Sequence, residues 1–146
     1  MRRVGPEDRE QFLRLAQEFY RSPAVLCPVP LSNLERTFDE LLRSDVYADG
    51  FLLETEEGRC MGYALTAKTF TQEAGGLCVW VEELYVLPPF QGQGVGGRTL
   101  ALLEEYYPNA KRLRLEVEPE NEAAARLYRR LGYEPLPYEQ YMKQRS

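Results

Sequence analysis

The chain has 146 residues, which at about 150 residues per domain predicts one domain over 1–146 with a core of its own. With 44% hydrophobic and 28% charged residues, its composition excludes the disordered, collagen-like and low-complexity classes. It contains no histidine and carries a net charge of -5, from 18 Lys and Arg against 23 Asp and Glu. These values exclude Ser-His-Asp and Cys-His nucleophile systems and imidazole zinc sites. They also argue against a nucleic-acid partner bound through its phosphates.

The three cysteines, Cys27, Cys60 and Cys78, form no CxxC pair, so the sequence indicates neither a zinc knuckle nor a disulfide framework. The N-terminus MRRVGPEDRE lacks an apolar leader region, and no apolar run approaches the roughly 18 residues that span a bilayer. We therefore expect a cytoplasmic protein without a metal and without a membrane partner.

The N-terminal part of the chain predicts two helices. A first helix follows Pro6, because apolar residues recur there at helical spacing: Phe12, Leu15, Ala16 and Phe19. Residues 22–30 contain three prolines and predict a loop. Ser32 and Glu35 then predict a capping box for a second helix, which extends to about Arg43.

The middle of the chain predicts three strands. Residues 51–55 and 60–70 have the composition of two strands joined by a short hairpin. Residues 77–87 form a third, nearly all-apolar segment, as expected of a strand buried on both faces, except for Glu82 and Glu83. Two carboxylates in the middle of such a strand are costly unless they are paired or used.

The last third of the chain alternates strand and helix. A glycine-rich segment, 90–97, opens a helix after the third strand, and residues 113–117 predict a further short strand. Another helix begins at the capping residue Asn121 and ends at Gly132. The alternating apolar residues of the remainder predict one or two last strands.

The glycine-rich loop, residues 91–97, stands where unpaired backbone N–H groups and the dipole of a helix bind anions. A Walker loop would end in Gly-Lys-Ser/Thr, and a dinucleotide fingerprint would read GxGxxG, whereas these glycines run GxGxGG. From glycine content alone, phosphate binding and a plain tight turn are equally supported.

The segment 86–97, VLPPFQGQGVGG, resembles motif A of the GNAT superfamily of acetyl-CoA-dependent N-acetyltransferases. The signature Gln/Arg-x-x-Gly-x-Gly/Ala is matched by Gln91, Gly94 and Gly96. Residues 121–133 resemble motif B, Asn-x-x-Ala-x-x-Leu-Tyr-x-x-x-Gly-Phe, with Tyr133 in place of the phenylalanine. The resemblance implies an α/β (α+β) fold with a mixed, mostly antiparallel sheet. This sheet would be splayed at its centre and would have helices on both faces.

The resemblance also implies where acetyl-CoA binds. The pantetheine arm would lie between the two splayed strands and bond to the backbone of Val86 and Leu87. Asn121 would contact the cofactor from the last helix. The pyrophosphate would lie on the backbone amides of Gln91, Gly92, Gln93, Gly94, Val95, Gly96 and Gly97.

The reaction needs a base for the amine and an acid for the departing thiolate, and without histidine the base is a carboxylate or a water held by one. The resemblance points first to Glu82, nine residues before Gln91. Glu83 lies on the opposite face of a regular strand, although a bulge would exchange the two. Glu116 competes, because a similar LEV segment in ribosomal-protein N-terminal acetyltransferases carries a catalytic glutamate. Tyr128 matches the general acid of the family.

Each of these residues also has a purely structural interpretation. Tyr128 falls on the apolar stripe of its helix and suits a core position. Glu82 and Glu83 are compatible with a solvent-facing strand end, and Glu116 with a surface ion pair.

The acceptor amine is only partly defined by the sequence. The pair Glu82 and Glu83 resembles the acidic pair of spermidine/spermine acetyltransferases, and the negative net charge also favours a cationic small molecule such as a polyamine or an amino sugar. A protein N-terminus or lysine stays open as the acceptor, as does a catalytically silent acyl-CoA-binding module. The resemblance leaves a homodimer open.

Overall fold

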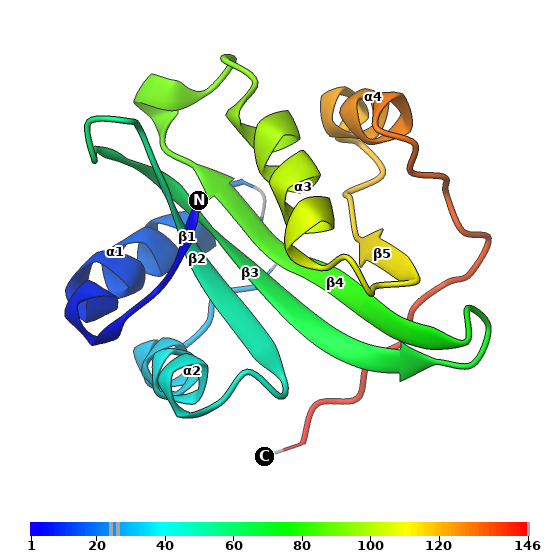
Figure 1. The fold of residues 1–146 in the computed structure, drawn as a ribbon, viewed down its shortest axis with the longest axis horizontal. Helices are drawn as coiled ribbons and strands as arrows, with labels where there is room; N and C mark the ends of the chain where they lie inside the picture. The colour runs from blue at the N-terminus through cyan, green and yellow to red at the C-terminus, as the bar shows by residue number, and fades with distance from the viewer. Residues whose placement is uncertain (24, 26, 146) are drawn as a thin grey trace. The chain divides into compact units, whose positions relative to one another are not determined.

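The computed structural model describes residues 1–23, 25 and 27–145 (Figure 1). Two of the proline-loop positions, 24 and 26, therefore lie outside the described residues. The chain divides into two compact units, Met1–Glu116 and Val117–Ser146. The expectation of one domain over 1–146 stays a prediction.

The first unit is built on one five-stranded sheet in the order β1-β2-β3-β4-β5. The first four strands pair antiparallel to one another, and β5 joins β4 in parallel. This arrangement confirms the predicted mixed, mostly antiparallel sheet. The strands are β1 (Arg2–Arg3), β2 (Ala48–Glu54), β3 (Cys60–Thr71), β4 (Gly76–Val86) and β5 (Arg112–Leu115).

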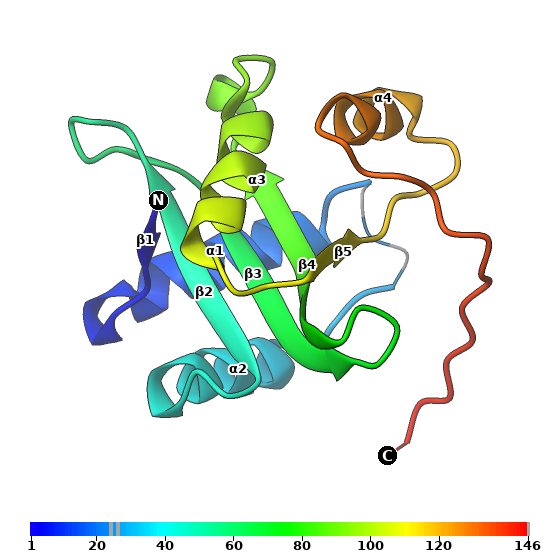
Figure 2. The same ribbon diagram turned by 45° about the vertical axis from the view of Figure 1, so that its right-hand side comes forward.

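Helices cover both faces of this sheet, as predicted (Figure 2). Successive residues of β2 point to opposite faces. Leu52 joins the core under α1 and α2, while the ring of Phe51 lies 4.9 Å from that of Tyr106, at the end of α3. The helices are α1 (Arg9–Tyr20), which follows a 3-10 turn at Pro6–Asp8, then α2 (Leu31–Arg43) and α3 (Val95–Tyr106).

The predicted capping box at the start of the second helix is wrong. Helix α2 begins at Leu31, one residue before Ser32, and Pro30 is its N-cap, with no side-chain cap hydrogen bond. The proline ring holds Pro30 at φ -65°, and its ψ of 146° is the extended conformation of a residue that precedes a helix. Ser32 therefore lies inside the first turn.

The second unit contains α4 (Glu122–Arg130). As predicted, Asn121 caps this helix, since its Oδ1 accepts a hydrogen bond from the backbone N–H of Ala124 at 3.1 Å. Gly132 follows the helix at φ 91°, in the left-handed region that favours glycine. The one or two last strands that the sequence predicted are absent from residues 133–145. Pro135 and Pro137 interrupt this segment, and prolines donate no hydrogen bond to a strand ladder.

No helix within the described part of the chain has both the length and the apolar character needed to cross a membrane.

Candidate functional site

A β-bulge lies at the acidic pair of β4. Leu65 of β3 pairs with Glu83, and the next residue, Thr66, pairs with Val81, so that Glu82 is an extra residue without a partner on β3. A bulge locally reverses the alternation of side chains along a strand. It leaves the Glu82 side chain exposed, while Glu83 lies on the face that α1 and α2 cover.

Strands β4 and β5 part next to this bulge. Their parallel pairing runs from Cys78 and Arg112 to Val81 and Leu115, whereas β4 continues to Val86. The sheet is therefore splayed between these two strands. Because β5 is the edge strand of the sheet in the described residues, the splay lies at its edge and not at the predicted centre. The backbone of residues 82–86 is left without a β5 partner on that side.

Two of the three candidate glutamates lie where strands β4 and β5 separate. Glu82 and Glu116 are the first residues beyond the last paired step, Val81 and Leu115. The pKa of Glu82 is raised, first by desolvation of its carboxyl and then by the negative charges of Glu116 and Glu83. The two residues that sequence reasoning treated as competing candidates thus interact at one place.

Glu83 has a different environment from Glu82. Its Oε1 accepts a hydrogen bond from the hydroxyl of Tyr63 at 2.6 Å, and its Oε2 accepts a short hydrogen bond from the hydroxyl of Tyr20. Burial raises the pKa of the Glu83 carboxyl, while the two phenol donors oppose that rise because they favour the charged form. The same contacts and burial raise the pKa of both tyrosines.

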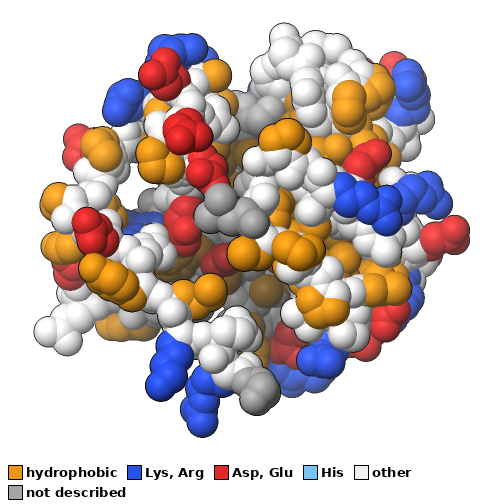
Figure 3. All heavy atoms as spheres, turned by 180° about the vertical axis from the view of Figure 1, so that it is seen from behind, with side chains coloured by type: hydrophobic (Ala, Val, Ile, Leu, Met, Phe, Trp, Pro, Cys, Tyr) orange, Lys and Arg blue, Asp and Glu red, His pale blue; other side chains and the backbone are white. Residues whose placement is uncertain are grey.

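Glu83 lines a pocket of about 260 Å³ within the first unit. Helices α1 and α2, strand β3 and the proline-rich loop supply the rest of its wall, and Val29 comes from that loop. Much of the lining is apolar or aromatic, including Phe12, Ala16, Tyr20, Leu34 and Leu65. Figure 3, which shows the molecule from behind the view of Figure 1, has acidic and hydrophobic side chains side by side near its middle.

The glycine-rich loop has the geometry of an anion site. Gly92 and Gly94 adopt positive φ values of 74° and 78°, and Gly94 is the N-cap of α3. The N–H groups of Val95, Gly96 and Gly97 donate to no acceptor in the described chain, whereas that of Arg98 bonds the Gly94 carbonyl at 3.0 Å.

The glycine-rich loop offers room for a ligand as well as hydrogen-bond donors. A Cβ added at Gly96 would meet no protein atom within 4 Å. Free N–H groups at a helix N-terminus suit a pyrophosphate, and the space around Gly96 lets a ligand approach the backbone closely. The residues predicted to hold that part of acetyl-CoA therefore fit the group.

The backbone groups of Val86 and Leu87, just before this loop, already form some hydrogen bonds within the protein. The Gln91 side chain donates from Nε2 to the Val86 carbonyl at 2.8 Å. The Leu87 N–H donates to the Met61 carbonyl at 2.8 Å, and the Leu87 carbonyl accepts from the Phe90 N–H at 2.9 Å. A carbonyl has two lone pairs, so Val86 and Leu87 each keep one acceptor position for a pantetheine amide.

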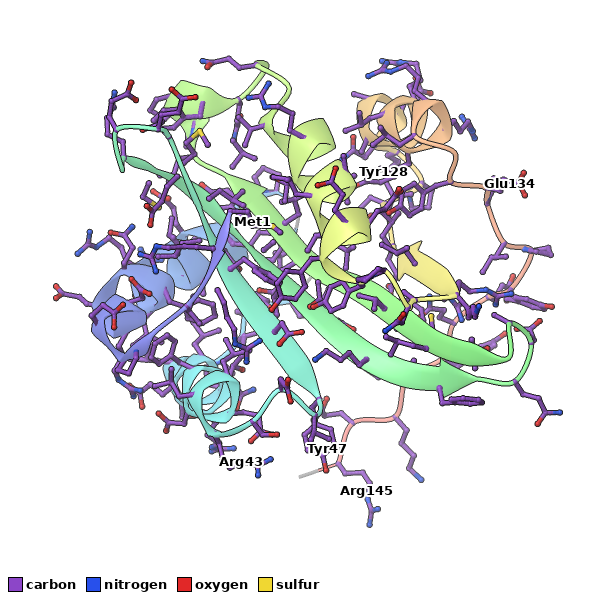
Figure 4. All side chains as sticks on the ribbon, in the orientation of Figure 1. Met1, Arg43, Tyr47, Tyr128, Glu134 and Arg145 are labelled. Atoms are coloured by element: carbon purple, nitrogen blue, oxygen red, sulfur yellow. The ribbon has the colours of Figure 1, made fainter. Side chains whose placement is uncertain are left out.

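The second unit carries Tyr128 and Asn121. Tyr128 lies on α4 (Figure 4), with its ring centroid 6.1 Å from that of Tyr133. Burial raises the pKa of the Tyr128 phenol. The Oδ1 of Asn121 is used as a helix cap, which leaves its amide N–H groups as donors.

Sequence reasoning missed the two tyrosines that hold Glu83. Tyr20 is the last residue of α1, and Tyr63 lies on β3, 20 positions before Glu83 along the chain. Tyr20 is not one of the apolar residues that predict the first helix, and Tyr63 is one residue of an apolar strand segment, so the sequence pattern singles out neither. A buried carboxylate needs hydrogen-bond donors, and this need is the signal that would have prompted a search for them.

Known proteins resemble this chain in sequence and in fold. A family model described as "Acetyltransferase (GNAT) family" matches residues 9–133. An uncharacterized N-acetyltransferase of Archaeoglobus fulgidus is 28% identical over 131 residues, which make up 88% of each chain.

Solved structures of acetyltransferases share the fold. AAC(6')-Iy, in complex with the bisubstrate analog CoA-S-monomethyl-acetylneamine, is similar with a TM-score of 0.80 and 19% identity, over 99% of this chain and 97% of that one. Ribosomal-protein-alanine N-acetyltransferase from Brucella melitensis biovar Abortus 2308 is similar with a TM-score of 0.70 and 16% identity, over 98% and 97%.

Proposed function

Because the chain belongs to the acetyltransferase (GNAT) family, we propose that it acetylates the primary amine of a small cationic molecule, by direct attack in a ternary complex. It is an acetyl-CoA-dependent N-acetyltransferase. The observation that carries the choice of acceptor is the group of carboxylates at the bulge, where Glu82 and Glu116 flank the parting strands and Glu83 lines the adjoining pocket. One carboxylate in the wall of a pocket, with two more where strands β4 and β5 separate, suits an ammonium ion.

Acetyl-CoA, when bound, supplies the thioester carbonyl that the amine attacks. The N–H groups of residues 91–97 would bind the pyrophosphate, in front of the open space at Gly96. The free lone pairs of Val86 and Leu87 would bind the pantetheine amides. Asn121 would donate a hydrogen bond to the cofactor from the start of α4.

The side chains would carry the two proton transfers. Glu82 would take a proton from the ammonium group, directly or through one water, and its raised pKa makes it a better base near neutral pH. Glu116 contributes to this raised pKa through its charge. Tyr128 would give its phenol proton to the departing thiolate, and its raised pKa keeps it protonated until then.

The test is release of the CoA thiol from acetyl-CoA by the purified protein over a panel of amines. The panel holds phenethylamine, isoamylamine, spermidine, neamine and a peptide with an N-terminal alanine. We expect turnover with small amines and little with the peptide. Preferred turnover of the peptide would favour a protein N-terminus as the acceptor, and tight CoA binding without any turnover would favour a silent binding module.

Two variants distinguish loss of the proposed base from a nonspecific effect of removing a carboxylate. Glu82→Gln removes the proposed base, and we expect kcat to fall about 10²-fold or more with little change in the KM for the amine. Glu10→Gln neutralises a carboxylate that is 91% exposed on α1 and should leave both constants unchanged. Equal constants for the Glu82 variant and the wild type would remove Glu82 from the mechanism.

A further inference from the structure

The pocket beside the bulge holds a carboxylate that is fixed in place by two phenols. Tyr20 bonds one oxygen of Glu83, and Tyr63 bonds the other at 2.6 Å. A carboxylate offers about four lone-pair positions, and two of them remain after these bonds are made. Glu83 is therefore held in one orientation with acceptor positions to spare.

The remainder of the pocket carries no charge among the lining residues that the structure describes. Phe12, Ala16 and Leu34 form an apolar wall. Thr37 supplies a hydroxyl, which donates to the backbone carbonyl of Asn33 at 2.8 Å. Asn33 and Thr37 are uncharged polar residues of the wall, and Glu83 is its one carboxylate among the described residues. A single carboxylate suits one positive charge, because each further ammonium group would be buried without a charged partner.

The volume of the pocket also favours a small occupant. Its volume of about 260 Å³ is about nine times the ~30 Å³ that a water molecule occupies in the liquid. Pockets for drug-sized ligands range from roughly 300 to 1,000 Å³. The space beside Glu83 therefore suits a compact organic cation.

We propose that this pocket is the acceptor site, and that Glu83, held by Tyr20 and Tyr63, binds the ammonium group of a compact amine with one positive charge on an apolar body. This inference rests on the proposed acetyl transfer and narrows its substrate class from cationic small molecules to monoamines. The assignment gives Glu83 the role of binding the substrate, while Glu82 removes the proton.

The reaction then runs as follows for such an amine. The ammonium group, bound to Glu83, would give one proton to Glu82, directly or through one water, and the free nitrogen lone pair would attack the thioester carbonyl. The C–N bond would form and the C–S bond would break as the Tyr128 phenol protonates the departing sulfur. The phenolate left on Tyr128 would then take the second proton from the nitrogen, and the proton on Glu82 would pass to solvent. The nitrogen of the product is a neutral amide, which keeps no ionic attraction to Glu83 and leaves the pocket.

The test measures binding of phenethylammonium to the protein alone by isothermal titration calorimetry, beside turnover of the same amine. Hydrogen bonds to a charged group contribute roughly 1.5–3 kcal/mol, so Glu83→Gln should weaken binding by about tenfold to a hundredfold. Tyr20→Phe keeps the carboxylate and should weaken binding less. Glu10→Gln is the matched control and should change neither measurement.

A second variant tests the cavity without altering its charge. Val29→Phe should narrow the pocket and weaken binding of phenethylamine far more than binding of ethylamine, since the loop residue Val29 lines the wall. Because it leaves Glu83 and its two tyrosines intact, it remains informative if the Glu83 variant does not fold.

Three results would overturn the inference. The first is binding by Glu83→Gln within twofold of the wild type, and the second is equal losses for both amines in Val29→Phe. The third is a kcat/KM for spermidine or neamine above that for phenethylamine. Failure of every amine to release thiol would overturn the proposed function instead, and the calorimetry would still decide whether the pocket binds monoamines.

Discussion

At the scale of single residues, the hydroxyl of Tyr128 is the group whose removal most directly tests the proposed acid. Tyr128→Phe keeps the ring that packs on α4 and removes only the proton donor. We expect kcat to fall about 10²-fold, with little change in the KM for acetyl-CoA, in steady-state thiol-release kinetics. Tyr138→Phe alters a tyrosine that is 64% exposed and should have no effect. An unchanged kcat in the Tyr128 variant would leave that residue with a packing role.

Glu116 allows a test of the proposed base through the pH dependence of the reaction. A base must be ionised to act, so kcat/KM rises with pH through the pKa of Glu82 in the free enzyme. The charge of Glu116 raises that pKa, and Glu116→Gln should therefore move the acid limb of the profile to lower pH. A primary alkylammonium has a pKa near 10 and does not titrate in that range. Loss of turnover at every pH would instead identify Glu116 as the base.

At the scale of elements, sequence reasoning found most of the local features, with the capping box at Ser32 as an exception, but it could not decide those that depend on pairing. The cap at Asn121 and the glycine-rich start of α3 follow from residues close together in the chain. The bulge at Glu82 depends on how β3 and β4 align, and a single strand does not contain that information. The pocket at Glu83 likewise needs Tyr20 and Tyr63 from two other elements.

A substitution at Gly96 should affect CoA binding by α3 without weakening the fold. It lies in the first turn of the helix, where alanine is favoured over glycine by about 1 kcal/mol, and an added Cβ would meet no protein atom within 4 Å. Gly96→Ala should therefore fold at least as stably as the wild type in urea denaturation. The same methyl group would take up space beside the backbone on which the proposed pyrophosphate lies, and the Kd for CoA should rise at least tenfold.

A matched substitution serves as the control for this prediction. Gly58→Ala places a methyl group in the β2–β3 hairpin, where nothing lies within 4 Å, but at a positive φ of 86°. It should cost about 1 kcal/mol of stability and leave CoA binding unchanged. CoA binding by Gly96→Ala as tight as that of the wild type would show that the phosphates lie elsewhere.

At the scale of the whole molecule, buried carboxylates hold distant parts of the first unit together. Asp49 of β2 is 1% exposed and forms ion pairs with Arg3 of β1 and with Lys68 of β3, the latter at 2.8 Å. It also accepts a hydrogen bond from Tyr107, just after α3, at 2.5 Å. Sequence analysis does not single out Asp49, because its partners lie far away along the chain.

Asp8 plays a similar part at the N-terminus, and its charge makes the stability of the fold depend on pH. It accepts two hydrogen bonds from the guanidinium of Arg2, at 2.8 and 2.9 Å, and one from the N–H of Gly5 at 2.7 Å. The Arg2 hydrogen bond, opposed by burial, lowers the pKa of Asp8 below its ordinary value of 3.8. The ionised form therefore stabilises the folded state above that value. This contribution is lost as the pH falls through the native pKa of Asp8.

Asp8→Asn should accordingly lower the free energy of unfolding by about 1–2 kcal/mol at pH 7, with the half-exposed Arg2 limiting the loss. Urea denaturation at several pH values should show this difference shrinking in acid. Glu83→Gln should behave in the opposite sense, because burial raises the pKa of Glu83 and the folded state favours its protonated form. Relative to that variant, the wild type should gain stability as the pH falls. A difference between wild type and Asp8→Asn that stays constant down to pH 2 would show that the charge of Asp8 contributes nothing to the fold.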